Sequence, residues 1–121
     1  MRSLRSRASC LVLIGAVSAF TMLAAVPADA AGTAVAMVEG NAKDAKTWKF
    51  EPANITVKAG TPVAWTNNGK QPHSASANDG SFDSGTMKGG AKWEHRFDRP
   101  GEFPYVCTFH PQMTGVVKVT P

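Results

Sequence analysis

The segment YVCTFHPQMTG, Tyr105 to Gly115, places a cysteine, a histidine and a methionine three residues apart around a proline. In a strand, an odd spacing would send the side chains of Cys107 and His110 to opposite faces. Pro111 removes a backbone donor and disfavours a helical conformation at the histidine before it. The flanking residues favour strand. The segment therefore predicts a strand, a tight turn and a second strand, with the turn bringing three soft or borderline donor atoms together.

The first 30 residues have the pattern of a secretory signal peptide. Three arginines precede an apolar run from Leu11 to Ala25, and Ala28-Asp29-Ala30 forms an A-x-A cleavage site. The apolar run is short for a membrane span. We therefore predict a signal peptide over residues 1–30, export to the periplasm with no stable membrane anchor, and one mature domain over residues 31–121.

The mature chain would hold a single cysteine, because Cys10 leaves with the leader. An unpaired thiol in an oxidising compartment is expected to be buried, bonded to another chain or bound to a metal. The plain alternative for Cys107 is a small buried hydrophobic residue. The neighbouring His110 and Met113 favour a metal. The charge balance, 10 lysines and arginines against 8 aspartates and glutamates without the leader, gives no nucleic-acid footprint.

Short strand-like segments separated by proline and glycine turns fill the mature chain, and no long segment has helical periodicity. Trp93, His95 and Phe97 alternate with charged residues, which is typical of a strand with one buried face. Many short strands at this spacing predict an all-β antiparallel sandwich or barrel. Strands are expected at Ala34–Glu39, Thr47–Phe50, Ile55–Lys58, Pro62–Asn67, His73–Ala77, Trp93–Asp98, Glu102–Cys107 and Val116–Thr120.

The donor types favour copper. A thiolate and a thioether together select a soft metal, and imidazole suits copper, zinc, iron or nickel. Zinc would prefer a further cysteine, histidine or carboxylate to a thioether. Two histidines and a cysteine in a plane, with a distant axial methionine, form a blue-copper electron-transfer site. The segment supplies one of the two histidines, so the other must be His73 or His95.

Local context separates these two histidines. His95 lies between Trp93 and Phe97 in the alternating strand, which indicates a histidine packed on or beside the core. His73 follows the turn-rich stretch NNGKQP, in which Pro72 fixes the approach of the chain. Alone, His73 would be interpreted as an exposed loop histidine. Together with the Cys107 triplet, it is the favoured remote ligand.

Two long stretches, FEPANITVKAGTPVAWTNNGKQPHSASA and FDRPGEFPYVCTFHPQMTGVVKV, resemble the cupredoxins, the family of small blue-copper proteins. The resemblance implies an eight-stranded Greek-key β-sandwich that binds one type 1 copper. It carries over four ligands, namely His73, Cys107, His110 and Met113. The two-residue gap between His110 and Met113 resembles the short ligand loop of amicyanin. One departure is Ser74, where many relatives have asparagine. Its hydroxyl can pair with Thr108 but has a shorter reach.

The resemblance also implies a function. It predicts a monomeric one-electron carrier that serves redox partner proteins such as a cytochrome c or a periplasmic dehydrogenase or reductase. The alternative is a protein that delivers or stores copper without redox turnover. An enzyme is not expected, because His95 is the only further histidine and the chain has no H-x-H pair for a catalytic copper.

Overall fold

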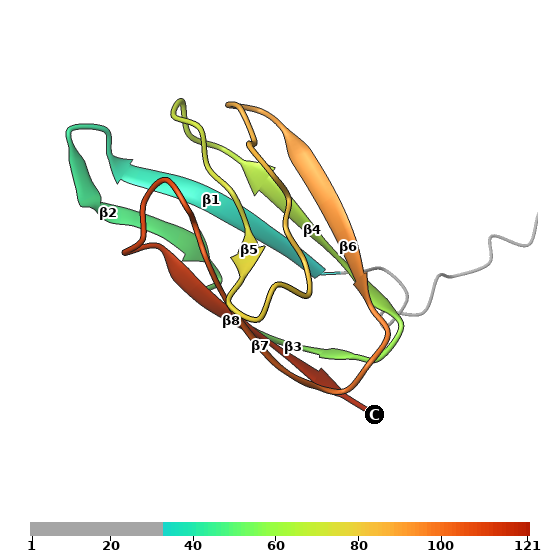
Figure 1. Ribbon diagram of the computed structural model, residues 1–121. Coiled ribbons are helices and arrows are strands. Elements are labelled where there is room, and N and C mark those ends of the chain that lie inside the picture. The colour runs from blue at the N-terminus through green and yellow to red at the C-terminus, as the bar shows by residue number, and fades with distance from the viewer. Residues whose placement is uncertain (1–32) are drawn as a thin grey trace, which may run out of the picture.

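The protein is an all-β sandwich of two four-stranded sheets in the computed structural model, which describes residues 33–121 (Figure 1). One sheet has the strand order β2-β1-β4-β6 and the other has the order β3-β8-β7-β5. The strands are β1 (Thr33–Asn41), β2 (Asp44–Glu51), β3 (Asn54–Lys58), β4 (Thr61–Asn67), β5 (Ser76–Ala77), β6 (Lys92–Phe97), β7 (Gly101–Val106) and β8 (Thr114–Thr120).

The chain passes repeatedly from one sheet to the other, as a Greek key requires. β1 pairs in parallel with β4, and β3 pairs in parallel with β8. The remaining pairs, including β1 with β2 and β7 with β8, are antiparallel. The eight-stranded Greek-key sandwich implied by the family resemblance is therefore confirmed.

The core lies between the inward faces of the two sheets. Every second residue of β4 is buried, ending at Trp65 and Asn67, and Val117 and Val119 of β8 are buried in the same alternation. The rings of Trp65 and Tyr105 meet edge to face across the core, with centroids 5.6 Å apart. The alternation of inward-facing and outward-facing residues along the strands thus explains why the two sheets pack face to face.

All eight expected strands exist, but the fifth is shorter than predicted. The sequence predicted strand from His73 to Ala77, whereas β5 has two residues. His73 instead forms an isolated bridge with Met87, and Ser76 forms one with Asp83. The chain therefore pairs with its own continuation at His73 and joins the second sheet only at Ser76 and Ala77, where β5 pairs with β7.

The predicted leader and the domain boundary after residue 30 lie outside the described residues, and so they stay predictions. Over residues 33–121, no helix has the length and apolar character needed to cross a membrane.

One end of the sandwich gathers three connections. These are the hairpin between β1 and β2, the loop between β4 and β5 and the turn between β7 and β8, toward the left and top of Figure 1. The side-chain amide of Gln112 donates to the carbonyl of Ala45 over 2.7 Å, which ties the last of these turns to the hairpin. Segments far apart in the sequence therefore meet here.

A pair of neighbouring valines tests this packing. Val117 is fully buried, whereas Val116 faces the other side of β8 and is partly exposed. Val117→Ala should lower the free energy of unfolding by about 2 kcal/mol, because it removes buried methyl groups and leaves a cavity. Urea unfolding of both alanine variants measures the difference. An equal loss for Val116→Ala would contradict the inward placement of Val117.

Candidate metal centre

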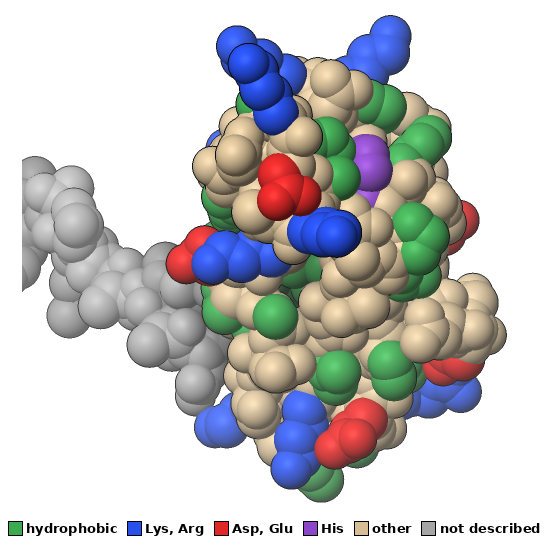
Figure 2. All heavy atoms as spheres, turned by 90° about the vertical axis from the view of Figure 1, so that its left-hand side faces the viewer, with side chains coloured by type: hydrophobic (Ala, Val, Ile, Leu, Met, Phe, Trp, Pro, Cys, Tyr) green, Lys and Arg blue, Asp and Glu red, His purple; other side chains and the backbone are tan. Residues whose placement is uncertain are grey.

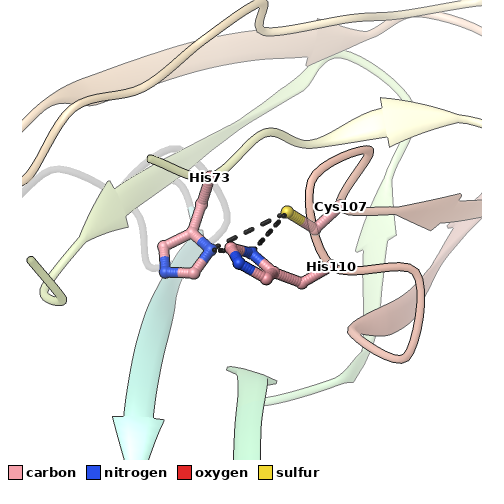
Figure 3. A group of neighbouring side chains, drawn as sticks. All are labelled: His73, Cys107 and His110. Carbon is pink, nitrogen blue, oxygen red and sulfur yellow. Dashed lines mark hydrogen bonds between the residues drawn. The ribbon is translucent and has the colours of Figure 1, made fainter. Parts of the chain in front are cut away.

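Two histidines and a cysteine converge at this end of the sandwich (Figure 3). Nδ1 of His73 and Nδ1 of His110 are 3.1 Å apart, and each lies 3.7 Å from Sγ of Cys107. A point equidistant from these three atoms is about 2 Å from each, close to the length of a bond from a metal to nitrogen or sulfur. The three side chains therefore form a site of the size of one metal ion.

The turn between β7 and β8 brings Cys107 and His110 together. The backbone N–H of Cys107 donates to the carbonyl of Met113 over 3.0 Å, and the N–H of Met113 donates to the carbonyl of His110 over 2.9 Å. β7 ends at Val106, so His110 lies in a tight turn and its odd spacing from Cys107 no longer separates the side chains. The strand, turn and strand predicted from the sequence are confirmed.

Met113, the fourth predicted donor, is buried with Cys107 in the hydrophobic cluster. Its side chain is 1% exposed, so the thioether has no access to bulk water. A thioether is a weak ligand that does not need water to satisfy it, and it suits such an apolar position.

The loop before His73 is held in shape by a buried asparagine. The side-chain amide of Asn67 donates to the carbonyls of Gln71 and Met87 over 2.8 and 2.9 Å, and its oxygen accepts from the N–H of Gly69 over 2.9 Å. The backbone of His73 pairs with Met87 in both directions. His73 is thus fully buried on a loop that is fixed on both sides.

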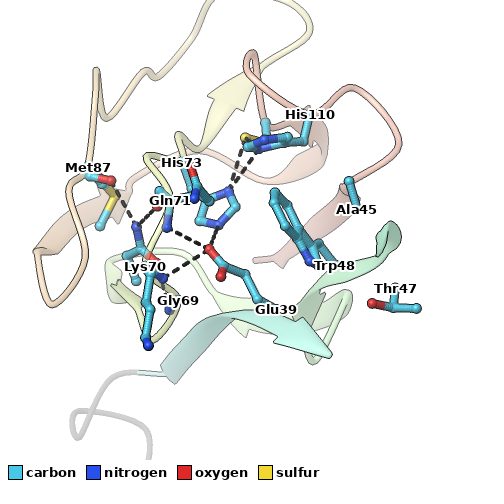
Figure 4. Close-up of polar contacts among 12 residues, drawn as sticks. Glu39, Ala45, Thr47, Trp48, Gly69, Lys70, Gln71, His73, Met87 and His110 are labelled. Atoms are coloured by element: carbon cyan, nitrogen blue, oxygen red, sulfur yellow. Dashed lines mark hydrogen bonds and ion pairs between the residues drawn. The ribbon is translucent and has the colours of Figure 1, made fainter. Parts of the chain in front are cut away.

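Sequence reasoning missed Glu39, the residue behind His73 (Figure 4). Oε1 of Glu39 lies 3.0 Å from Nε2 of His73, on the side of the ring away from Cys107. A signal was present in the sequence, because Val35 and Met37 point inward from β1 and Glu39 continues their alternation. A carboxylate on an inward face needs partners.

Hydrogen bonds keep the Glu39 carboxyl ionised. Burial raises its pKa, but the backbone N–H groups of Gln71 and Lys70 and the ring of His73 lower it by more. The net pKa of Glu39 therefore lies below its usual value. The N–H groups of Lys70 and Gln71 donate to Oε1 over 3.0 and 2.8 Å.

Ser74 connects the two loops that carry the donors. Its backbone N–H donates to the sulfur of Cys107 over 3.4 Å. Its hydroxyl oxygen accepts from the N–H of Thr108 over 3.0 Å and lies 2.9 Å from the Thr108 hydroxyl. The expected pairing of Ser74 with Thr108 is confirmed, and the shorter side chain still spans the gap. The loop of His73 therefore reaches the sulfur through a backbone donor as well as through the His73 ring.

Trp48 of β2 covers the two histidines. Its ring meets His110 edge to face at 4.6 Å between centroids and lies 5.7 Å from His73. The indole N–H donates to the carbonyl of Asn41, which fixes the ring against the hairpin. Burial, followed by the neighbouring His73, lowers the pKa of His110, while Glu39 opposes the shift. His110 nevertheless remains partly exposed.

His95 lies apart from this group, as its alternation predicted. It stacks on Trp93 at 5.6 Å and meets Phe97 edge to face at 4.9 Å. Burial lowers its pKa, and Asp98 opposes that shift. Among the residues that the structure describes, the group with metal-binding geometry contains His73, Cys107 and His110 and leaves His95 out.

Comparison with known sequences identifies the family. A model of the cupredoxin-like domain matches residues 12–119. Amicyanin-alpha of Methylorubrum extorquens is 30% identical over 118 residues, covering 90% of this chain and 97% of the relative. The chloroplastic plastocyanin of Tetradesmus obliquus is 35% identical over 111 residues, covering 74% of this chain and 76% of the relative.

Comparison with solved structures agrees with this family. A purple cupredoxin from Nitrosopumilus maritimus superposes with a TM-score of 0.65 at 30% identity, covering 73% of this chain and 99% of that chain. A copper-containing nitrite reductase from Thermus scotoductus superposes with a TM-score of 0.63 at 26% identity. That match covers 74% of this chain but 22% of the reductase, so a fold of this kind is only a part of that enzyme.

Mutation can separate the two candidates for the remote histidine, His73 and His95. His73→Ala should abolish tight copper binding, because it removes one of three converging donors, whereas His95→Gln should leave it intact. Copper content after desalting and the visible spectrum of the loaded protein measure both effects. Loss of copper in the His95 variant alone would show that the wrong histidine has been chosen.

Proposed function

The chain belongs to the cupredoxin family, and we propose that it is an exported type 1 copper protein that carries single electrons between partner proteins. The observation that carries the proposal is the triangle of Nδ1, Nδ1 and Sγ atoms, 3.1 to 3.7 Å on a side, at the end of a sandwich. Two imidazoles and a thiolate at this spacing fit copper better than zinc, given the thioether of Met113 nearby.

Four residues would hold the copper. Nδ1 of His73, Nδ1 of His110 and Sγ of Cys107 would bind the copper, and the thioether of Met113 would be a fourth, weaker donor. The copper would supply a one-electron couple between Cu(I) and Cu(II). Burial of Cys107 and Met113 and the cover of Trp48 support this assignment, because they keep water from the donors.

The role of the chain is to hold its donors in one arrangement. The carbonyl of Met113 fixes the backbone of Cys107, Asn67 fixes the loop of His73, and Ser74 joins the two loops. A donor set that is already in place need rearrange little when an electron arrives or leaves, which favours fast transfer. These hydrogen bonds support a carrier.

Catalysis is not part of the proposal. The relatives named amicyanin and plastocyanin are small cupredoxins that the chain covers over most of their length. A catalytic copper would need further histidines, and the remaining one, His95, packs against the rings of Trp93 and Phe97 on β6.

Electrons would enter and leave at His110, which reaches the surface from the buried site. Phe109 beside it is 45% exposed, and Pro111 and Gln112 are exposed as well. Figure 2 shows a histidine side chain at the surface of this face, bordered by hydrophobic side chains, with lysine or arginine side chains nearby. An apolar contact that desolvates readily suits a partner that must bind and release quickly. Periplasmic partners, a cytochrome c or a dehydrogenase or reductase, would fit.

The deciding experiment is the visible spectrum of the oxidised, copper-loaded protein. A thiolate bonded to Cu(II) should give an intense visible band, and Cys107→Ser should lose it even if copper still binds. A full-strength band in the serine variant would refute the assignment. A reversible wave at an electrode supports a carrier, whereas rapid copper loss to a chelator without such a wave indicates delivery or storage.

Replacement of Phe109 tests the exit at His110. Phe109→Ser should slow electron transfer to the native partner about fivefold, which corresponds to about 1 kcal/mol of lost contact. The spectrum and the reduction potential should stay unchanged, because Phe109 is exposed and its side chain has no donor atom for a metal. Stopped-flow kinetics measures the rate at several salt concentrations, since exposed lysines such as Lys70 and Lys88 would steer the encounter. An unchanged rate in a folded variant would place the exit elsewhere.

A further inference from the structure

Glu39 is a carboxylate on the core-facing side of a strand. It follows Val35 and Met37 in the inward alternation of β1, and its side chain is 7% exposed. The pairing of β1 with β2 shifts register between Glu39 and Asn41, as at a β-bulge. Bulges commonly re-aim a side chain. The strand thus delivers a negative charge to the end of the core, where isolated charges are costly.

One oxygen of this carboxylate makes three contacts. Oε1 accepts from the N–H groups of Lys70 and Gln71 and lies 3.0 Å from Nε2 of His73. The loop makes room for it at Gly69, because a Cβ at that position would overlap Oε1 and Cδ of Glu39. Both the strand and the loop are therefore shaped around this contact.

We propose that Glu39 is a positioning residue for the metal centre, which fixes the tautomer of His73 and places a negative charge behind it. This inference rests on the proposed function, because it concerns the same site. Glu39 does not touch the metal position itself, since Nε2 and not Nδ1 of His73 faces it.

The tautomer follows from donor and acceptor chemistry. A carboxylate only accepts hydrogen bonds, so Nε2 of His73 must carry the hydrogen. A neutral imidazole has one N–H and one lone pair, which leaves the lone pair on Nδ1, the atom that faces Cys107 and His110. Carboxylate–histidine pairs of this kind orient metal ligands and strengthen their basicity.

The charge has a separate consequence. A negative charge held behind a ligand attracts the doubly charged Cu(II) more strongly than the singly charged Cu(I). The difference is larger in a site that excludes water. Glu39 should therefore lower the reduction potential of the centre. Removing the charge while keeping the shape of the side chain should raise the potential.

Three variants separate these effects. Glu39→Gln keeps the size of the side chain and removes its charge. Gly69→Ala keeps the charge but must displace the carboxylate. Glu51→Gln is the matched control, because Glu51 lies on β2 with a side chain that is 59% exposed. The measurements are voltammetry and chelator competition on the copper protein, and nitrogen NMR of the His73 ring in the metal-free protein.

We expect Glu39→Gln to keep the intense visible band and to have a higher potential than wild type, with Glu51→Gln unchanged. Gly69→Ala should bind copper at least tenfold more weakly in the chelator competition, in line with the effect of removing the partner of a ligating histidine. Metal-free wild type should show His73 as the Nε2–H tautomer. In Glu39→Gln this preference should weaken, since an amide can accept from Nε2 or donate to it.

Absence of the intense band in wild type would overturn the proposed function itself. With the band present, equal potentials for the two glutamine variants and an unchanged His73 tautomer would overturn the role of Glu39 alone. Should Glu39→Gln fail to fold, the metal-free wild type still decides, because an Nδ1–H tautomer of His73 contradicts the proposal.

Discussion

The two hydrogen bonds that close the turn between β7 and β8 set the geometry of the metal centre. They join Cys107 to Met113 and Met113 to His110, each through backbone atoms. A strand that continued past Val106 would hold Cys107 and His110 on opposite faces. The turn folds both toward the end of the core, and β8 then returns along β7. The loop between β4 and β5 then needs only to bring His73 beside Cys107 and His110.

Polar groups at this end of the core are connected to one another and do not stand alone. Asn67 satisfies three backbone groups of the loop around it, and Ser74 bridges to Thr108 and to Ser76. Ser76 in turn donates to Asp83 over 3.0 Å. Buried polar groups stabilise a single arrangement when all of them are paired, and an unpaired one destabilises it. The same network therefore holds the loops together and keeps the donors in register.

The sequence was most informative where spacing and residue type acted together. Three donors at steps of three around a proline predicted the turn, and alternation predicted that His95 lies in a strand, where the structure has it in β6, apart from the group that contains His73. The contributions of Glu39 and Trp48 were not predicted, because both come from the first hairpin, more than 20 residues from any donor. Their arrival depends on the register of β1 with β2 and with β4, which residue patterns alone do not fix. The fifth strand was predicted too long, because the chain at His73 pairs with its own continuation and not with the sheet.

Separate parts of the chain supply the donor atoms of the centre and the groups that surround them. The loop of His73 and the turn of Cys107 provide the converging donor atoms, while β1 and β2 provide the charge behind one histidine and the ring over the other. Transplanting the two ligand loops into another sandwich would thus carry over metal binding without its electrostatic setting. Conversely, under the proposed function, hairpins of different sequence on this scaffold would change the potential while leaving the donor atoms in place, so redox tuning and metal capture would evolve independently.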